Sequence, residues 1–194
     1  MNTNTLKDML ARWAVLMAEK KDWLIELDSV AGDSDLGLTM SDGFRAASEA
    51  AAAFSQPDLG KLAYQAGKAM AAAVPSTMGT LMASGLMNAG KALKGLTEAE
   101  DAAFFRAYLE GVENRGKARP GEKTFLDGLL PAVEALETGA SPEEASRIAW
   151  EAFENTRDML ACHGRMAIRG EASRGLLDPG AAVAALLIQG YAED

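Results

Sequence analysis

Asp28, Asp33 and Asp35 fall within eight residues of one another, and glycines at 32 and 37 flank the last two. Carboxylates this close raise one another's pKa unless a cation neutralises them. Hard divalent cations prefer carboxylate oxygens, and magnesium often shares its coordination between a few acids and the phosphates of a substrate. The spacing therefore favours a site for a divalent cation.

The expected local geometry suits this chemistry. Asp28 would project from the last turn of a helix, and Gly32 would let the chain turn so that Asp33 and Asp35 face back toward it. The competing interpretation is an EF-hand, whose twelfth loop position must carry a carboxylate. Counted from Asp33, that position is Phe44, so the EF-hand is excluded.

The next expected helix opens directly after these acids, at residues 37–39. Free backbone N–H groups and the positive end of the helix dipole favour a phosphate at such a place. Metal ligands beside an anion site point to a metal-bridged nucleotide or another polyphosphate. A purely structural interpretation stays open, in which Asp33 caps the helix and Asp28 and Asp35 are solvated.

The elements that must position these residues are helices, because apolar residues recur at three- and four-residue steps and no stretch alternates as a strand does. Capping patterns set several helix starts: Asp58 is expected to cap the third helix and Thr97 to open the fifth. Ser141 is expected to cap the seventh helix, and Asp178 the eighth. The sequence predicts a single all-α domain over residues 1–194 with about eight helices. The expected helices are residues 6–28, 38–54, 58–74 and 79–93, one from 97 to a loop at 114–121, 123–136, one from 141, and 178–191.

Composition limits the partners and the compartment. Lys and Arg total 19 against 28 Asp and Glu, which gives a net charge of −9 and a pI near 4.7. This balance argues against nucleic acid or an anionic membrane as a partner. The lone Cys162 excludes an internal disulfide, and no run approaches the roughly 18 apolar residues of a membrane span. With no recognisable signal peptide, a cytoplasmic location is expected.

Five motifs in order give the chain a resemblance to the nucleotide-binding L subunit of dihydroxyacetone (glycerone) kinases, over nearly its whole length. That family carries a GDGDHG-like turn after an acid, a GTSG-type turn, a GDRTMLDALVPA pattern, a GRAS segment and DPGA. The matching stretches here are GDSDLG at 32–37, PSTMGTLM at 75–82, GEKTFLDGLLPA at 121–132, GRMA at 164–167 and DPGA at 178–181.

The resemblance implies a fold and a set of ligand contacts. Such subunits are barrels of eight antiparallel helices that bind an adenine nucleotide, ADP or ATP, and two Mg²⁺ ions at one end. The metal ligands would be Asp28, Asp33 and Asp35. Contacts with the nucleotide are implied for Leu36, Gly37, Leu38, Thr39, Thr77, Met78, Gly116, Phe125, Arg165, Asp178, Pro179 and Gly180.

Two of these side chains also permit a structural interpretation. Guanidinium binds phosphate oxygens through paired hydrogen bonds and stays charged, so Arg165 suits a phosphate; otherwise it is a surface arginine. Phe125 either stacks on adenine or fills the core. His163 is given no catalytic role, because the residue that holds the ketose in this family lies on another subunit.

The resemblance also implies a reaction with partners. The phosphoryl group would pass to dihydroxyacetone or a similar small ketose held on a separate K subunit. It would come from free ATP or from a phosphocarrier subunit of the phosphotransferase system, and homodimer formation stays open. Three departures from the family keep alternatives open: Leu36 replaces a histidine, Ser34 a glycine and Met78 a small polar residue. A nucleotide-sensing module without turnover and a helical scaffold without a ligand are those alternatives.

Overall fold

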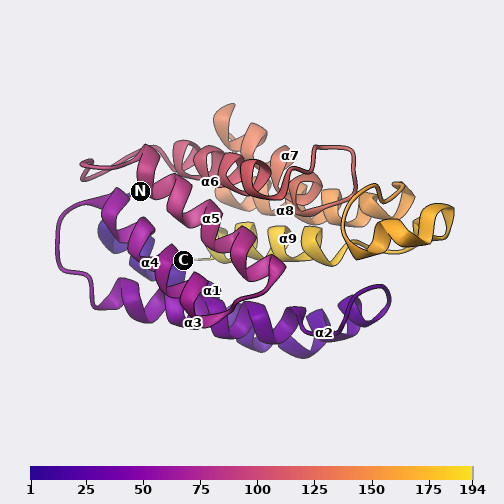
Figure 1. Cartoon of the computed structure of the whole chain (residues 1–194). Helices are drawn as coiled ribbons and strands as arrows, with labels where there is room; N and C mark the ends of the chain where they lie inside the picture. Colours follow the sequence, from indigo (N-terminus) through magenta and orange to yellow (C-terminus); the bar gives the residue numbers. More distant parts are fainter. Residues whose placement is uncertain (194) are drawn as a thin grey trace. The chain divides into compact units, whose positions relative to one another are not determined.

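The computed structural model describes residues 1–193, and they form an all-α structure (Figure 1), as the sequence predicts. Within this range no strand forms, and Asn2 and Glu98 make one isolated antiparallel bridge. None of the helices in residues 1–193 has both the length and the apolar character that crossing a bilayer requires. The helices are α1 (Thr3–Glu19), α2 (Lys21–Ser29), α3 (Leu36–Ala52), α4 (Leu59–Ala73), α5 (Thr77–Ala92), α6 (Asp101–Gly116), α7 (Phe125–Glu137), α8 (Pro142–Asn155) and α9 (Pro179–Ala192), with 3₁₀ helices η1 (Thr156–Asp158) and η2 (Arg165–Ser173).

Several helix starts follow the predicted capping residues. Asp58 accepts a hydrogen bond from the Lys61 N–H at 2.9 Å before α4, and Ser141 accepts one from Glu144 at 3.2 Å before α8. Asp178 accepts one from Ala181 at 2.7 Å before α9. These caps satisfy N–H groups that a helix leaves free in its first turn.

Several of the expected boundaries were wrong. Residues 6–28 are not one helix, because the backbone breaks at Lys20 (φ −90°, ψ 4°) between α1 and α2. The fifth helix does not start at Thr97: the Ala99 N–H bonds to the Met1 carbonyl at 2.9 Å, and α6 begins only at Asp101. That helix continues to Gly116, into the loop expected from residue 114.

The chain divides into two compact units. The first comprises Met1–Glu19 and Leu38–Gly116, and the second comprises Lys20–Gly37 and the chain from Lys117 onward. This division does not test the prediction of a single domain over residues 1–194, which stays a prediction.

The first unit packs α4 against α5 and α5 against α6, which run beside each other in Figure 1. Glycines permit these close contacts: a Cβ on Gly60 would lie 2.5 Å from the Gly90 carbonyl oxygen, and one on Gly85 would lie 2.6 Å from the Tyr108 ring. The fully buried Trp13 forms the aromatic centre, with the rings of Phe44, Phe105 and Tyr108 in edge contact.

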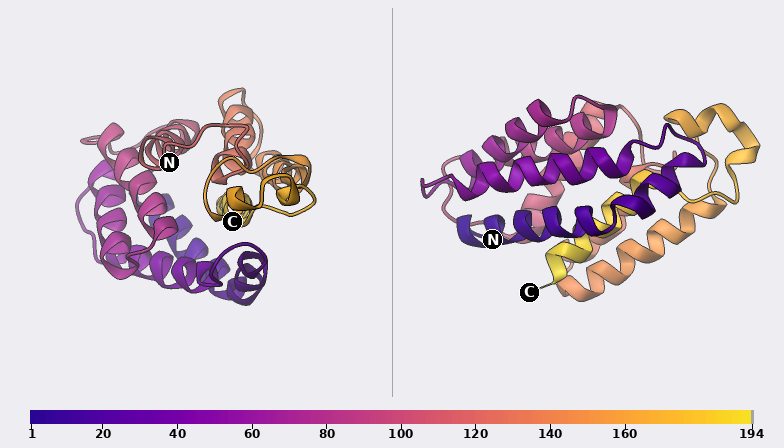
Figure 2. Two further views of the ribbon diagram at one scale, coloured as in Figure 1. Left: turned by 45° about the vertical axis from the view of Figure 1, so that its right-hand side comes forward. Right: turned by 90° about the horizontal axis from the view of Figure 1, so that it is seen from below.

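The second unit is built around α9, whose residues are nearly all buried. Helices α7 and α8 both pack on α9, and α8 and α9 lie side by side in the views of Figure 2. A Cβ on Gly128 in α7 would lie 2.8 Å from the Ala181 backbone, so α7 and α9 touch closely near their N-termini. Helix α2 joins this unit through Trp23, which contacts the rings of Trp150 and Phe153.

Candidate functional site

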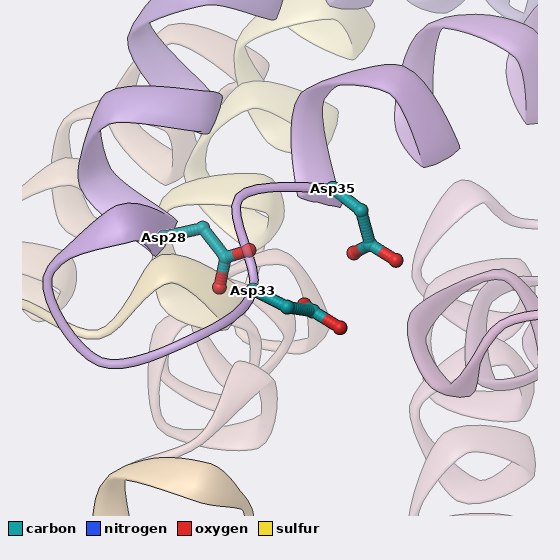
Figure 3. A group of neighbouring side chains, drawn as sticks. All are labelled: Asp28, Asp33 and Asp35. Carbon is teal, nitrogen blue, oxygen red and sulfur yellow. The ribbon is translucent and has the colours of Figure 1, made fainter.

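The three predicted acids lie together in the second unit. Asp28 belongs to the last turn of α2, Asp33 to the connecting loop, and Asp35 immediately precedes α3, and their side chains extend to the same side of the loop (Figure 3). One oxygen from each lies within 4.8 Å of the other two. Oxygens on opposite sides of one Mg²⁺ ion are about 4.2 Å apart, so the three carboxylates lie close enough together to share a cation.

Asp28 gives the clearest indication that a cation fits here. Its Oδ2 atom is buried and has no hydrogen-bond partner among residues 1–193. A buried carboxylate oxygen without a donor costs free energy that a coordinated cation offsets. The neighbouring Gly32 leaves space for this carboxylate, because a Cβ at that position would lie 1.9 Å from Asp28 Oδ1. The donor set and the unsatisfied oxygen therefore fit a divalent cation.

The turn between the acids is made by Ser34, whose φ of 65° lies in the left-handed region that favours glycine. Gly32, which was expected to provide the turn, is not among the residues with positive φ. Its role is the close approach to Asp28. The positive φ at Ser34 gives a physical reason why a glycine suits this position in the family that the sequence resembles.

Repulsion between the carboxylates acts on Asp35. Partial burial raises the pKa of Asp35 above its ordinary value, and the neighbouring carboxylates of Asp33 and Asp28 raise it further. Arg165 opposes this effect: its Nη2 donates to Asp33 Oδ2 at 2.5 Å, and its side chain stays 65 % exposed. The guanidinium of Arg169 donates to the Val30 carbonyl. The segment that carries both arginines is therefore held against the acidic loop.

The start of α3 follows the cluster directly. The Leu36 side chain is buried, so contacts with a ligand at this position would pass through its backbone N–H. Gly37 is also buried, whereas Leu38 is half exposed and Thr39 is buried. The N–H groups of this first turn have no partner within the helix itself, and they directly follow the acids in the sequence, where an anion site is expected.

A second group of predicted residues surrounds the paired N-termini of α7 and α9. Asp178 caps α9, Pro179 occupies its first position, and a Cβ on Gly180 would lie 3.0 Å from the Phe125 N atom. Burial raises the pKa of Asp178 to about 7. Phe125 is 3 % exposed, which favours the core interpretation of its ring.

In the first unit, the structure places the remaining predicted residues near one end of the helix pair α5 and α6. Thr77 and Met78 open α5 behind Ser76, whose hydroxyl accepts a hydrogen bond from the Gly79 N–H at 3.0 Å. Gly116 ends α6, where a Cβ would lie 3.1 Å from the Leu81 side chain. Their contact with a nucleotide rests on the motif resemblance and stays a prediction.

The sequence identified Lys123 only as the start of an expected helix, and its burial was not predicted. Its side chain is 1 % exposed, and its ammonium donates to the carbonyls of Met159, Ser173 and Leu176. The backbone of Lys123 has a φ of 62°, again in the left-handed region. A charged residue inside the GEKTFLD motif was the available signal, but its burial depends on contacts with residues some 36 to 53 positions away.

Comparisons with known proteins show the family of this chain. Residues 30–193 match the DAK2 domain family. The chain is 35% identical over 187 residues to the ADP-binding subunit DhaL of a PEP-dependent dihydroxyacetone kinase from Listeria innocua, covering 93% of each chain. It is 33% identical to the corresponding subunit from Escherichia coli, covering 93% of this chain and 91% of that one. It is also 35% identical to L-erythrulose 1-kinase of Mycolicibacterium smegmatis, covering 95% of this chain and 34% of that longer one.

A solved structure shares the fold. The crystal structure of the dihydroxyacetone kinase of C. freundii in its native form matches with a TM-score of 0.79 and 22% identity, over 99% of this chain and 34% of that one. The all-α fold is therefore shared with about a third of that kinase. The family match over most of the chain and the identities with separate subunits together show that this chain belongs to the DAK2 domain family, as a homologue of the ADP-binding subunits of dihydroxyacetone kinases.

Proposed function

We propose that this chain is the nucleotide-binding subunit of a kinase for small ketoses, holding Mg–ADP or Mg–ATP at the acidic loop. The observation that carries the proposal is the grouping of Asp28, Asp33 and Asp35 with a buried, unsatisfied Asp28 oxygen, in a chain of this family. The relatives named ADP-binding subunits support the nucleotide. A solved relative in complex with AMP-PNP and Mg²⁺ supports the metal.

Each residue of the site has a defined task in this proposal. Asp28, Asp33 and Asp35 would hold Mg²⁺, of which the resemblance implies two ions. When bound, the metal neutralises charge on the phosphates, which is the main requirement of phosphoryl transfer. The backbone N–H groups at the start of α3 would bind phosphate oxygens, and Arg165 would turn from Asp33 to a phosphate oxygen once the metal replaces it there.

The chain would act with partners. The phosphoryl group would pass to dihydroxyacetone or erythrulose, since the relatives include kinases named for both sugars. The ketose would be held on a separate K subunit, as the family resemblance implies. The donor would be a phosphocarrier of the phosphotransferase system or free ATP; relatives named PEP-dependent and PTS-dependent support the former.

Calorimetry of Mg–ADP binding tests the metal role. The wild-type chain should bind, Asp33→Asn should bind at least tenfold more weakly because it loses a charged ligand, and Asp22→Asn should bind like the wild type. Asp22 is an exposed acid of the same unit, so this control removes the same charge elsewhere. Equal affinity in all three variants, or no binding by the wild type, would exclude the proposed site.

A nucleotide-sensing module without turnover is the second candidate. It is favoured by Leu36 and Met78, which replace polar residues that the resembling family places near the phosphates. A reaction with a K subunit, a phosphoryl donor and a panel of dihydroxyacetone and both erythrulose enantiomers separates the two functions. A phosphorylated ketose supports the kinase subunit, and tight Mg–ADP binding without product supports the sensor.

A further inference from the structure

The buried ammonium of Lys123 takes no part in the proposed site, although it contacts the η2 segment that carries Arg165. The Lys123 ammonium donates three hydrogen bonds, to the carbonyls of Ser173 at 2.6 Å, Leu176 at 2.7 Å and Met159 at 3.3 Å. An ammonium has three N–H donors and no acceptor. The three carbonyls therefore use every donor of this side chain.

These carbonyls belong to the two ends of one loop. Met159 begins the loop formed by residues 159–176, Ser173 and Leu176 lie at its other end, and η2, which starts at Arg165 and ends at Ser173, belongs to it. The ends also bond to each other, since the Ala161 N–H donates to Ser173 Oγ at 3.0 Å and the Gly175 N–H donates to the Arg157 carbonyl at 2.8 Å. Lys123, the residue before the α7 cap, thus ties both ends of the loop to the start of that helix.

The position of Lys123 is itself fixed. Its successor Thr124 caps α7, and the Asp127 carboxylate accepts hydrogen bonds from the Thr124 N–H at 2.7 Å and the Gly121 N–H at 2.5 Å. Desolvation lowers the pKa of Lys123, and the nearby Asp178 carboxylate opposes that effect. The capped start of α7 thus places the desolvated ammonium of Lys123 against the two ends of the loop, which together form its base.

We propose that Lys123 is a positioning residue, which fixes the base of the 159–176 loop so that Arg165 stays at the acidic cluster. The proposal rests on the proposed nucleotide site, because Arg165 is its link to the ligand. Without the ammonium, three carbonyls at the loop base lose their donor, and the loop opens by local unfolding. Arg165 then no longer has a fixed position from which to bind a phosphate.

The test is a double-mutant cycle on Mg–ADP affinity with Lys123→Met and Arg165→Gln. Methionine has a similar length and no donor. We expect Lys123→Met alone to weaken binding about 10- to 100-fold, the range for residues that orient a ligand-binding group. In the Arg165→Gln background it should add almost nothing, since its effect passes through Arg165. Additive losses, or unchanged affinity in Lys123→Met, would overturn the inference.

Lys117→Met is a matched control, because Lys117 is exposed, belongs to the same unit and shares the backbone φ of 62°. Hydrogen exchange of residues 159–176 should accelerate in Lys123→Met and stay as in the wild type in Lys117→Met. If the wild type shows no Mg–ADP binding, the proposed function fails. If it binds but the two losses add, only the role of Lys123 fails.

If Lys123→Met does not fold, an experiment on the wild-type protein tests the proposed role of Lys123. By reciprocity, a nucleotide that needs the closed loop must also stabilise it. Labelling of lysine amines with acetic anhydride should therefore modify Lys123 several-fold more slowly with saturating Mg–ADP, while Lys117 reacts equally in both conditions. Equal protection of Lys123 with and without nucleotide would refute the coupling.

Discussion

Replacing Gly32 with alanine should remove Asp28 from the metal site without changing any charge. A Cβ at this position would lie 1.9 Å from Asp28 Oδ1, 2.5 Å from its Cγ and 2.9 Å from its backbone oxygen. Ordinary contacts begin near 3.4 Å, so the carboxylate must retreat by about 1.5 Å. Metal–oxygen distances tolerate only about 0.2 Å. The substitution therefore costs one of three carboxylate ligands.

We expect Gly32→Ala to weaken Mg–ADP binding by about 10- to 100-fold, or roughly 1.4–2.8 kcal/mol. Calorimetry gives the affinity, and thermal unfolding without ligand shows whether the fold persists. Gly43→Ala is the control, because its Cβ would meet only the side chains of Val74 and Met70 at 3.0–3.4 Å. A folded Gly32→Ala variant that binds Mg–ADP as tightly as the wild type would refute the role of Asp28 as a ligand.

Three further predictions concern Asp178, Ser34 and Arg165. The folded chain keeps the Asp178 proton up to a pKa of about 7, against 3.8 ordinarily, so stability should fall as pH rises from about 4 to 7, by up to about 4 kcal/mol. Asp178→Asn should remove that contribution in denaturant titrations at several pH values, and equal pH profiles would contradict it. Ser34→Gly should keep the Mg–ADP affinity of the wild type. Ser34→Val should lower both this affinity and the melting temperature, because β-branched residues tolerate a φ of 65° poorly. Calorimetry that finds the same affinity in both variants would count against this. Arg165→Gln should cost under about 1 kcal/mol of stability, since its ion pair is exposed, but weaken Mg–ADP binding at least tenfold; undiminished binding would show that Arg165 does not reach the phosphates.

Features that depend on neighbouring residues could be predicted from the sequence. The caps at Asp58, Ser141 and Asp178 form because a side-chain oxygen bonds to an N–H three residues later, which the sequence pattern shows directly. The acidic loop is local in the same sense, since its three carboxylates lie within eight residues.

Features that depend on distant partners could not be predicted in this way. The capping pattern at Thr97 is overruled because residues 98 and 99 pair with the first two residues of the chain. The ion pair between Arg165 and Asp33 spans 132 residues. Lys123 resembles any lysine before a helix until the loop ends from far along the chain bury its ammonium. In each case tertiary contacts decide what local propensity leaves open.

The central claim is that a divalent cation joins the three aspartates to a nucleotide phosphate. The most direct measurement is anomalous diffraction from crystals grown with Mn²⁺ and ADP, in which manganese replaces magnesium. We predict an anomalous peak in contact with Asp28, Asp33 and Asp35 and with a phosphate oxygen, with Arg165 released from Asp33. Bound ADP with no metal peak at these carboxylates, and with Arg165 still paired to Asp33, would contradict the claim.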